Sequence, residues 1–243
     1  MSVSDSAAKD TIIILQARTA SERFPGKVLK ELQGIPMLVY SIRRLKKVDN
    51  GMQVIVATSD LVQDDTIEEL AEREKTPCFR GSEKDVLDRF YMAAKEYEAK
   101  IVIRATGDNP LVDPFEARRV FNTISEKEYQ YVSGFEEVDG SQLPIGSGIE
   151  AFSFEALEEI WRIGDKPEYR EHINEYIFDN PEEFKSYYLK CLPENSCPEL
   201  RLTVDTQEDY EFVEGIGNTL GGLVDLSTSE IIRWWKNMQN RDG

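Results

Sequence analysis

Short apolar runs rich in β-branched residues alternate along this chain with longer segments in which apolar residues recur at helical spacing. The runs indicate strands buried on both faces, and the segments between them indicate helices that cover a sheet. The alternation predicts an α/β fold with a mostly parallel central sheet flanked by helices, and ligands of such folds bind at the carboxyl ends of the strands. The expected strands are residues 11–15, 53–58, 77–79, 100–104, 129–133 and 200–204, and the expected helices are residues 36–48, 64–75, 82–97, 114–125, 206–218 and a last one capped by Ser227 and Glu230.

This alternation is interrupted before the expected strand at 200–204. The elements expected there are a loop at 135–147, strands at 150–154 and 184–192, and helices at about 154–163 and 167–179. We interpret the segment at about 143–192 as an inserted, small projecting lobe. Residues 11–243 then form one domain, preceded by a flexible tail at 1–10.

Composition excludes several classes of partner. The chain has 46 acidic residues against 29 Lys and Arg, a formal net charge of −17. Such a surface repels phosphates, so we expect no nucleic-acid partner, and a small anionic ligand would need a local group of cations. No apolar run approaches the length of a bilayer span, so we expect no membrane partner. Cys78, Cys191 and Cys197 match neither a zinc site nor a disulfide framework, which favours the cytoplasm.

A local group of cations follows the first expected strand, in the stretch ILQARTASERFPGKVLKEL. Arg18, Arg23 and Lys27 lie there with hydroxyl groups and a Pro-Gly turn, a combination that binds phosphate oxygens. The stretch is not a Walker loop, because Gly26-Lys27 is followed by Val28. A solvated surface loop with incidental cations is the alternative, and the loop alone does not decide between the two.

Two acids follow expected strands elsewhere in the chain. Asp108 lies in RATGDNPLVDP and Asp205 lies in LRLTVDTQEDY, each just past an apolar run. Both carboxylates are therefore expected at the edge of the sheet that carries the cationic loop. Oxygen ligands that face a phosphate loop are typical of a Mg²⁺–polyphosphate site. Alternatively, Asp108 is a turn former and Asp205 caps the next helix.

Three stretches together resemble a known family: QARTASERFPGKVLKELQGIPML, TGDNPLVDP and LRLTVDTQEDY. They are similar to the signatures of bacterial sugar-acid cytidylyltransferases, which include the CMP-Kdo and CMP-sialic acid synthetases. The greatest similarity is to the spore-coat polysaccharide cytidylyltransferase branch, from Thr11 to about Trp235. The resemblance implies a Rossmann-like, three-layer nucleotide-diphospho-sugar transferase fold with a dimerisation lobe. It also implies a cytoplasmic homodimer that transfers CMP from CTP to a sugar acid with Mg²⁺, releasing pyrophosphate, for surface polysaccharide synthesis.

The resemblance also implies roles for individual residues. Arg18, Lys27 and Asp108 are expected to be catalytic, and Asp108 and Asp205 to bind the metal. The residues expected to bind nucleotide are Ala17, Arg18, Ser21, Arg23, Lys27, Ser59, Asp60, Arg80, Gly81, Ser82 and Asp108. Glu22 is expected to offset part of the charge of Arg23.

Glu150, Arg170 and His172 are expected to contact the sugar. For His172, the only histidine, a structural role in a helix is the alternative. Ile149 departs from the branch pattern, where a small or acidic residue is usual, and so leaves the sugar open. The sequence does not distinguish cytosine from other bases.

Two other functions compete with this interpretation. A glycosyltransferase could share the sheet and the metal, but its usual Asp-x-Asp motif is absent at 106–109. A non-catalytic relative would be expected to have lost one of Arg18, Lys27, Asp108 or Asp205, and the chain keeps all four.

Overall fold

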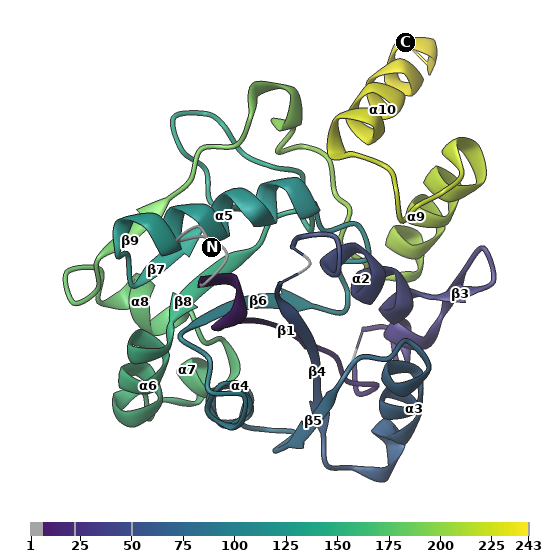
Figure 1. The fold of residues 1–243 in the computed structure, drawn as a ribbon. Helices are drawn as coiled ribbons and strands as arrows, with labels where there is room; N and C mark the ends of the chain where they lie inside the picture. The colour runs from purple at the N-terminus through teal and green to yellow at the C-terminus, as the bar shows by residue number, and fades with distance from the viewer. Residues whose placement is uncertain (1–6, 22, 50, 243) are drawn as a thin grey trace.

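The structure, a computed structural model, describes residues 7–21, 23–49 and 51–242. Within these residues, seven strands form one central sheet in the order β5-β4-β1-β6-β8-β7-β9 (Figure 1). The strands are β1 (Thr11–Gln16), β4 (Gln53–Ser59), β5 (Cys78–Gly81), β6 (Ile101–Thr106), β7 (Tyr131–Ser133), β8 (Glu150–Ser153) and β9 (Ser186–Tyr188). A small hairpin, β2 (Glu31–Leu32) and β3 (Ile35–Pro36), lies outside this sheet.

The sheet is mostly parallel, and its strand order reverses between β1 and β6. Strand β1 pairs in parallel with β4 on one side and with β6 on the other. Strand β8 is the exception, since it is antiparallel to both β6 and β7. The carboxyl ends of β1 and β6 therefore flank the switch point, where ligands of open α/β sheets bind.

Helices cover both faces of the sheet (Figure 1). One face packs against α2 (Met37–Leu45), α3 (Asp65–Arg73) and α5 (Pro114–Lys127), and the other against α4 (Val86–Glu96), α6 (Phe154–Ile163) and α8 (Glu175–Asp179). The short helix α7 (Pro167–Glu171) contacts α4. Strand β1 is buried on both faces, which explains its run of consecutive apolar residues. Ile13 and Leu15 enter the first core, whereas Ile12 and Ile14 enter the second.

A third apolar core joins the C-terminal region to the loop after β1. It contains Phe24, Leu111 and Val204, together with residues of α9 (Gln207–Leu220) and α10 (Thr228–Asp242). Trp234 and Trp235 are partly buried against it. As predicted, Ser227 and Glu230 cap α10 with reciprocal hydrogen bonds.

The segment at 143–192, predicted to be an inserted lobe, contributes two strands to the central sheet. It supplies β8, which is inserted between β6 and β7, and β9, which pairs with β7 at one edge of the sheet. The single helix predicted at 167–179 is divided into α7 and α8, because the backbone at His172 is extended and Ile173 is buried in the second core. The two strands of the 143–192 segment are therefore part of the central sheet.

Two further expectations are corrected by the structure. Residues 200–204 are extended and largely buried, but they make only an isolated bridge, between Arg201 and Ile145. The domain also begins before Thr11, because Ala8 is 4% exposed and packs in the first core. Residues 1–6 of the expected tail lie outside the described residues. No helix of the described residues combines the length and the apolar character that crossing a bilayer requires.

Candidate active site

The cationic loop after β1 is held in a defined conformation. Gly26 adopts φ 69° and precedes the short 3₁₀ helix η1 (Lys27–Leu29), and its N–H donates to the Thr19 carbonyl at 2.9 Å. A left-handed residue at this turn favours glycine. Phe24 enters the third core, so the loop is fastened on its inner side. Lys27 is consequently 8% exposed, and the loop is not simply solvated.

Lys27 lies between the two acids that the sequence singled out. Its Nζ donates to Asp108 Oδ2 and to Asp205 Oδ1, each at 2.9 Å. The backbone keeps the two acids adjacent, because the Val204 N–H donates to the Asp108 carbonyl at 2.8 Å. The structure therefore brings Lys27, Asp108 and Asp205 together, although Asp205 does not follow a strand of the sheet.

Asp205 is embedded in positive charge. Besides Lys27, it pairs with Arg23 at 3.1 Å and with Arg201 at 2.6 Å. Burial alone would raise the pKa of Asp205, but the hydrogen bond and charge of Lys27, with Arg23 and Arg201, outweigh it and lower that pKa. Thr206, and not Asp205, caps α9. Asp205 is therefore an ionised carboxylate held beside the loop.

Arg18 leaves the end of β1 in a different direction. It pairs with Glu171 of α7 at 3.0 Å and donates to the Glu83 carbonyl at 3.4 Å. Close to it, Arg89 of α4 is fully buried and donates to the Ser82 carbonyl. Burial, and then the charge of Arg18, lower the pKa of Arg89 to about 10. Arg18 and Arg89 form a second group of cations at this edge.

Asp64 anchors the loop to the end of β4. This fully buried carboxylate accepts from the Thr19 N–H at 2.8 Å, the Thr19 hydroxyl at 2.6 Å and the Ser59 hydroxyl at 2.5 Å. Burial would raise its pKa, but these hydrogen bonds outweigh burial and lower the pKa. Ser59, expected to bind nucleotide, is thus engaged in fastening β4 to the loop.

Other residues expected at the nucleotide pocket lie at or near the ends of β1, β4 and β5. Arg80 turns toward α3, where it pairs with Asp65 and Glu68 and donates to the Ser59 and Leu61 carbonyls. The remaining members make local contacts: Ala17 N–H to Ala57 carbonyl, Phe24 N–H to Ser21 hydroxyl, Asp60 N–H to Gly81 carbonyl, and Asp85 N–H to Ser82 hydroxyl. Glu22 lies outside the described residues.

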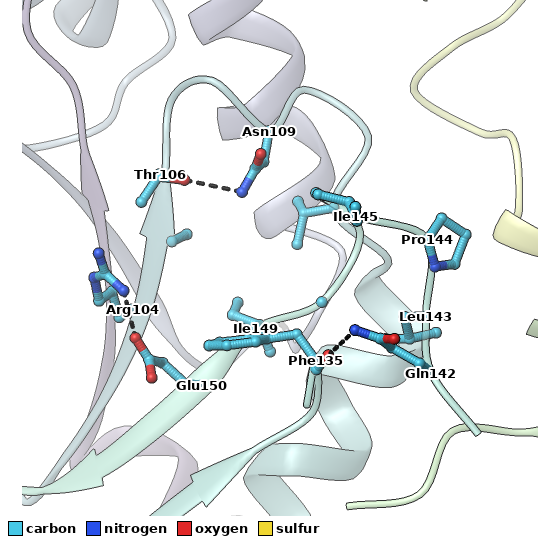
Figure 2. A pocket seen from close by; sticks show the side chains of 14 residues that line it. Arg104, Thr106, Asn109, Phe135, Gln142, Leu143, Pro144, Ile145, Ile149 and Glu150 are labelled. Carbon is cyan, nitrogen blue, oxygen red and sulfur yellow. Dashed lines mark hydrogen bonds and ion pairs between the residues drawn. The ribbon is translucent and has the colours of Figure 1, made fainter. Parts of the chain in front are cut away.

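A cavity of about 280 Å³ opens beside this cluster, between the ends of β6 and β8 (Figure 2). Its walls include Asn109, the residue after Asp108, and Ile149, the position at which the chain departs from the branch pattern. Glu150, which we expected near the sugar, also lines it and is 1% exposed. Arg104 pairs with Glu150 at 2.5 Å.

Arg170 and His172 do not line this cavity. Arg170 pairs with Asp85 at 2.5 Å and donates to the Trp161 carbonyl at 3.0 Å, which ties α7 to α4 and α6. His172 is exposed at the end of α7. The structure therefore places both residues at the junction of α7 with its neighbours, apart from Glu150.

Sequence reasoning missed four residues of this edge: Asp64, Arg89, Arg104 and Arg201. From the sequence, Asp64 is interpreted as the first residue of a helix and Arg89 as an ordinary charged residue within a helix, so neither was assigned to the site. Arg104 offered a signal, because a charge at the end of a buried strand needs a partner. That partner, Glu150, is distant in sequence and becomes adjacent only through the antiparallel pairing of β6 with β8.

Comparisons with known proteins show what this chain is similar to. The pattern of a family described as cytidylyltransferase matches residues 12–231. The chain is 33% identical to the spore coat polysaccharide biosynthesis protein SpsF of Bacillus subtilis, over 92% of each chain. Among solved structures it is similar to a cytidylyltransferase from Leptospira borgpetersenii, with a TM-score of 0.87 and 30% identity over 95% of each chain.

A more distant solved structure shares the fold alone. It is a CMP:2-keto-3-deoxy-manno-octonic acid synthetase complexed with CTP, with a TM-score of 0.66 and 18% identity. The alignment covers 86% of this chain and 99% of that one. The likeness shows that this chain shares a Rossmann-like fold with that synthetase.

Proposed function

The chain belongs to the cytidylyltransferase family, and from that premise we propose that it transfers CMP from CTP to a hydroxyl group of a sugar acid, with release of pyrophosphate. The observation that carries the proposal is the contact of Lys27 with both Asp108 and Asp205 beside the cationic loop. Transfer of a phosphoryl group depends chiefly on positioning and charge, with little covalent chemistry from the protein. This edge of the sheet provides charges of both signs within hydrogen-bonding distance.

The sugar-acid acceptor is supported by two of the similar proteins. SpsF is a spore coat polysaccharide biosynthesis protein, and the distant fold neighbour is a synthetase of CMP-linked 2-keto-3-deoxy-manno-octonic acid. By analogy, we propose an acceptor of the Kdo, sialic, legionaminic or pseudaminic acid class. The product would serve the synthesis of a surface polysaccharide.

The residues present fit a Mg²⁺ ion that binds together with the nucleotide. Asp108 and Asp205 offer oxygen ligands, and Mg²⁺ is usually held by one or two carboxylates plus substrate phosphates. The described residues contain no group of three or more His, Cys, Asp or Glu side chains that could hold a metal without such help. When bound, the ion would neutralise charge on the triphosphate and on the departing pyrophosphate.

Within the chain, each cation has a distinct task in the proposed reaction. Lys27 is nearly buried and would contact the phosphate at which substitution occurs. Arg18 has a side chain that is 32% exposed, and it pairs with Glu171, which is itself 49% exposed. An ion pair this exposed contributes little stability, so the guanidinium can exchange Glu171 for a phosphate. No general base is assigned.

The function is tested by measuring pyrophosphate release with each of four nucleoside triphosphates and a panel of sugar acids. We expect release that requires CTP, a sugar acid and Mg²⁺ together. A glycosyltransferase would instead consume a nucleotide sugar and release a nucleoside diphosphate, and a non-catalytic relative would release neither. Either of these two results would contradict the proposal.

A homodimer is also proposed, from the relationship to this family. Four aromatic residues of the 143–192 segment, Tyr169, Tyr176, Phe178 and Tyr188, pack against other aromatic rings of the same chain. Tyr187 is 36% exposed, yet it stacks on Tyr129. Static light scattering at micromolar concentration should give twice the monomer mass, and a monomer mass would contradict the proposal.

A further inference from the structure

The cavity between β6 and β8 has two polar ends and an apolar wall (Figure 2). Arg104 and Glu150 lie at one end, and Thr106 and Asn109 lie at the other. The apolar wall between them comes from Val112, Phe135, Leu143, Pro144, Ile145 and Ile149. Its volume of about 280 Å³ is close to the lower limit for ligand pockets, which suits one sugar unit and not an oligosaccharide.

Its position suits the acceptor of the proposed reaction. Asn109 lines the cavity and directly follows Asp108, which contacts Lys27. A hydroxyl group of a ligand in the cavity would therefore lie next to the phosphate that Lys27 and Asp108 are proposed to position.

Arg104 and Glu150 are the only charged residues among those that line the cavity, and they differ in what they can still bind. Glu150 is 1% exposed, and both its carboxylate oxygens already accept: Oε1 from Arg104 Nη1 and Oε2 from the Tyr131 hydroxyl, each at 2.5 Å. The Arg104 side chain is 16% exposed, and its buried Nε has no acceptor among the described residues. A ligand therefore finds unused donors on Arg104.

Unsatisfied groups in a buried site indicate what the missing ligand must supply. Leaving a buried donor unpaired lowers stability, so a ligand that provides an acceptor gains affinity there. The cavity has a complementary deficit at its other end, because Asn109 Oδ1 is buried and lacks a donor. A ligand with a carboxylate near one end and a hydroxyl group near the other would satisfy both.

We propose that Arg104 binds the carboxylate of the acceptor, that Asn109 Oδ1 accepts from one of its hydroxyl groups, and that Glu150 with Tyr131 holds Arg104 in position. This inference rests on the proposed function and adds the residues that select a sugar acid over a neutral sugar. Guanidinium–carboxylate pairs are strong and directional, because the guanidinium can donate two parallel hydrogen bonds. Glu150 itself is a positioning residue, since its oxygens are already occupied. The apolar wall packs on carbons of the sugar ring.

The experiment compares the sugar acid that gives the fastest pyrophosphate release with its carboxamide, which has the same shape and no charge. Wild type should prefer the acid by at least about a hundredfold in kcat/KM, the scale at which a buried polar site rejects a ligand lacking its partner. Arg104→Gln should raise KM for the acid by about a hundredfold and reduce the preference to less than about tenfold. It should change KM for CTP by less than about twofold.

Three further variants separate recognition from folding. Arg104→Gln with Glu150→Gln leaves no unpaired buried carboxylate, and it should show the same loss of preference with a near-normal melting temperature. Arg104→Lys should recover only part of the preference, because a lysine cannot donate the paired hydrogen bonds. Arg162→Gln, on an exposed arginine of α6, is the matched control and should behave as wild type.

Two outcomes would overturn the inference. Equal turnover of the acid and the carboxamide by wild type would mean that a neutral sugar occupies the cavity. A rise in KM for CTP as large as that for the acceptor would move Arg104 to the nucleotide site. In both cases CTP-dependent pyrophosphate release survives, and with it the proposed function. Absence of release with every sugar acid would instead overturn the proposed function, and this inference with it.

Discussion

Lys27 bridges two carboxylates that would otherwise repel each other. Asp108 and Asp205 both lie 2.9 Å from its Nζ, so a divalent cation that bound these acids would have to displace the ammonium group. A triphosphate provides the reason for displacement, because its oxygens offer Lys27 new partners. The geometry therefore predicts an order of binding, with the metal entering together with the nucleotide.

This order can be measured without turnover. Mn²⁺ serves here as a spectroscopic substitute for Mg²⁺. In the absence of nucleotide, we expect it to bind the wild-type protein at least about tenfold more weakly than Lys27→Met, in which the two acids no longer pair with an ammonium group. Adding CTP should raise the Mn²⁺ affinity of the wild-type protein to nearly that of Lys27→Met. Asp205→Asn should bind Mn²⁺ weakly with or without CTP. Electron paramagnetic resonance of free Mn²⁺ gives the affinities. Equal affinity of free wild type and Lys27→Met for Mn²⁺ would refute the order.

The three cations of the loop should contribute unequally to catalysis. Lys27→Ala and Arg18→Ala should each lower kcat/KM for CTP by at least about a hundredfold, the scale of a lost contact to charge in the transition state. Arg23→Ala should cost clearly less, because its side chain is 68% exposed and solvent weakens its field. Arg18→Lys should recover little, since a point charge does not replace a bidentate guanidinium on phosphate. Normal kinetics for Lys27→Ala and Arg18→Ala would leave the loop without a role.

Residues near the site were predictable where the sequence places a charge beside a strand end. That rule brought out Arg18, Lys27 and Asp108, and it also brought out Asp205, although the apolar run before Asp205 is not a strand of the sheet. Arg80 and Arg170 were expected at the site from the family resemblance, and in the structure their guanidinium groups bind the carboxylates of α3 and of Asp85. Sequence position alone does not show toward which neighbour a long side chain turns.

At the scale of elements, apolar runs predicted burial more reliably than they predicted pairing. Residues 11–15 and 200–204 have similar patterns, yet the first forms the central strand of the sheet and the second enters the third core largely unpaired. Near the end of the helix α2, Arg44 is fully buried and donates to the Val112 and Leu223 carbonyls. Burial of that residue depends on a loop near the other end of the chain.

Asp64 joins two elements, and its removal should loosen the loop that carries Lys27. Asp64→Asn keeps the size of the side chain but loses an acceptor for donors from Thr19 or Ser59, so we expect a loss of about 1–3 kcal/mol in unfolding free energy at pH 7. Asp165→Asn, at an exposed acid, is the control and should change little. Urea unfolding measures both, and an unchanged midpoint for Asp64→Asn would count against the anchoring role.

The pH dependence of this stability has a defined sign. The folded pKa of Asp64 is lowered below its ordinary value of 3.8, so its contribution is fully present above about pH 5. It is lost as the pH falls below 3.8 and through the lowered pKa. The difference in stability between wild type and Asp64→Asn should therefore be constant from pH 7 to pH 5 and narrow below pH 4. A difference that grows as the solution is acidified would have the wrong sign.

For the whole molecule, the alternation of strands and helices was enough to predict a mostly parallel sheet, but not the order of its strands. Strand β8 enters between β6 and β7 in the antiparallel sense, although it follows both in sequence. The composition of residues 143–192 does not indicate which strands of the sheet β8 and β9 pair with. The cavity was likewise beyond prediction, because its walls come from β6, β8 and the loops at 109–112 and 142–149.

Since the site joins distant parts of the chain, its ligand should stabilise the whole fold. Lys27, Asp108 and Asp205 are contributed by the loop after β1, the turn after β6 and the segment before α9, which pack in the first and third cores. A ligand that binds only the native state at a hundred times its Kd adds about 2.7 kcal/mol. For a domain of this size, that corresponds to a rise in Tm of roughly 5–11 °C.

The rise should depend on the metal and on the base. A protein with a net charge of −17 repels free CTP, so CTP without Mg²⁺ should raise Tm by less than half as much, and EDTA should reverse the full effect. GTP and ATP with Mg²⁺ should give smaller shifts than CTP, because the family is one of cytidylyltransferases. Lys27→Ala should nearly abolish the shift while retaining its own melting transition. Differential scanning fluorimetry gives all these values, and equal shifts from CTP, GTP and ATP would show that the pocket does not select cytosine.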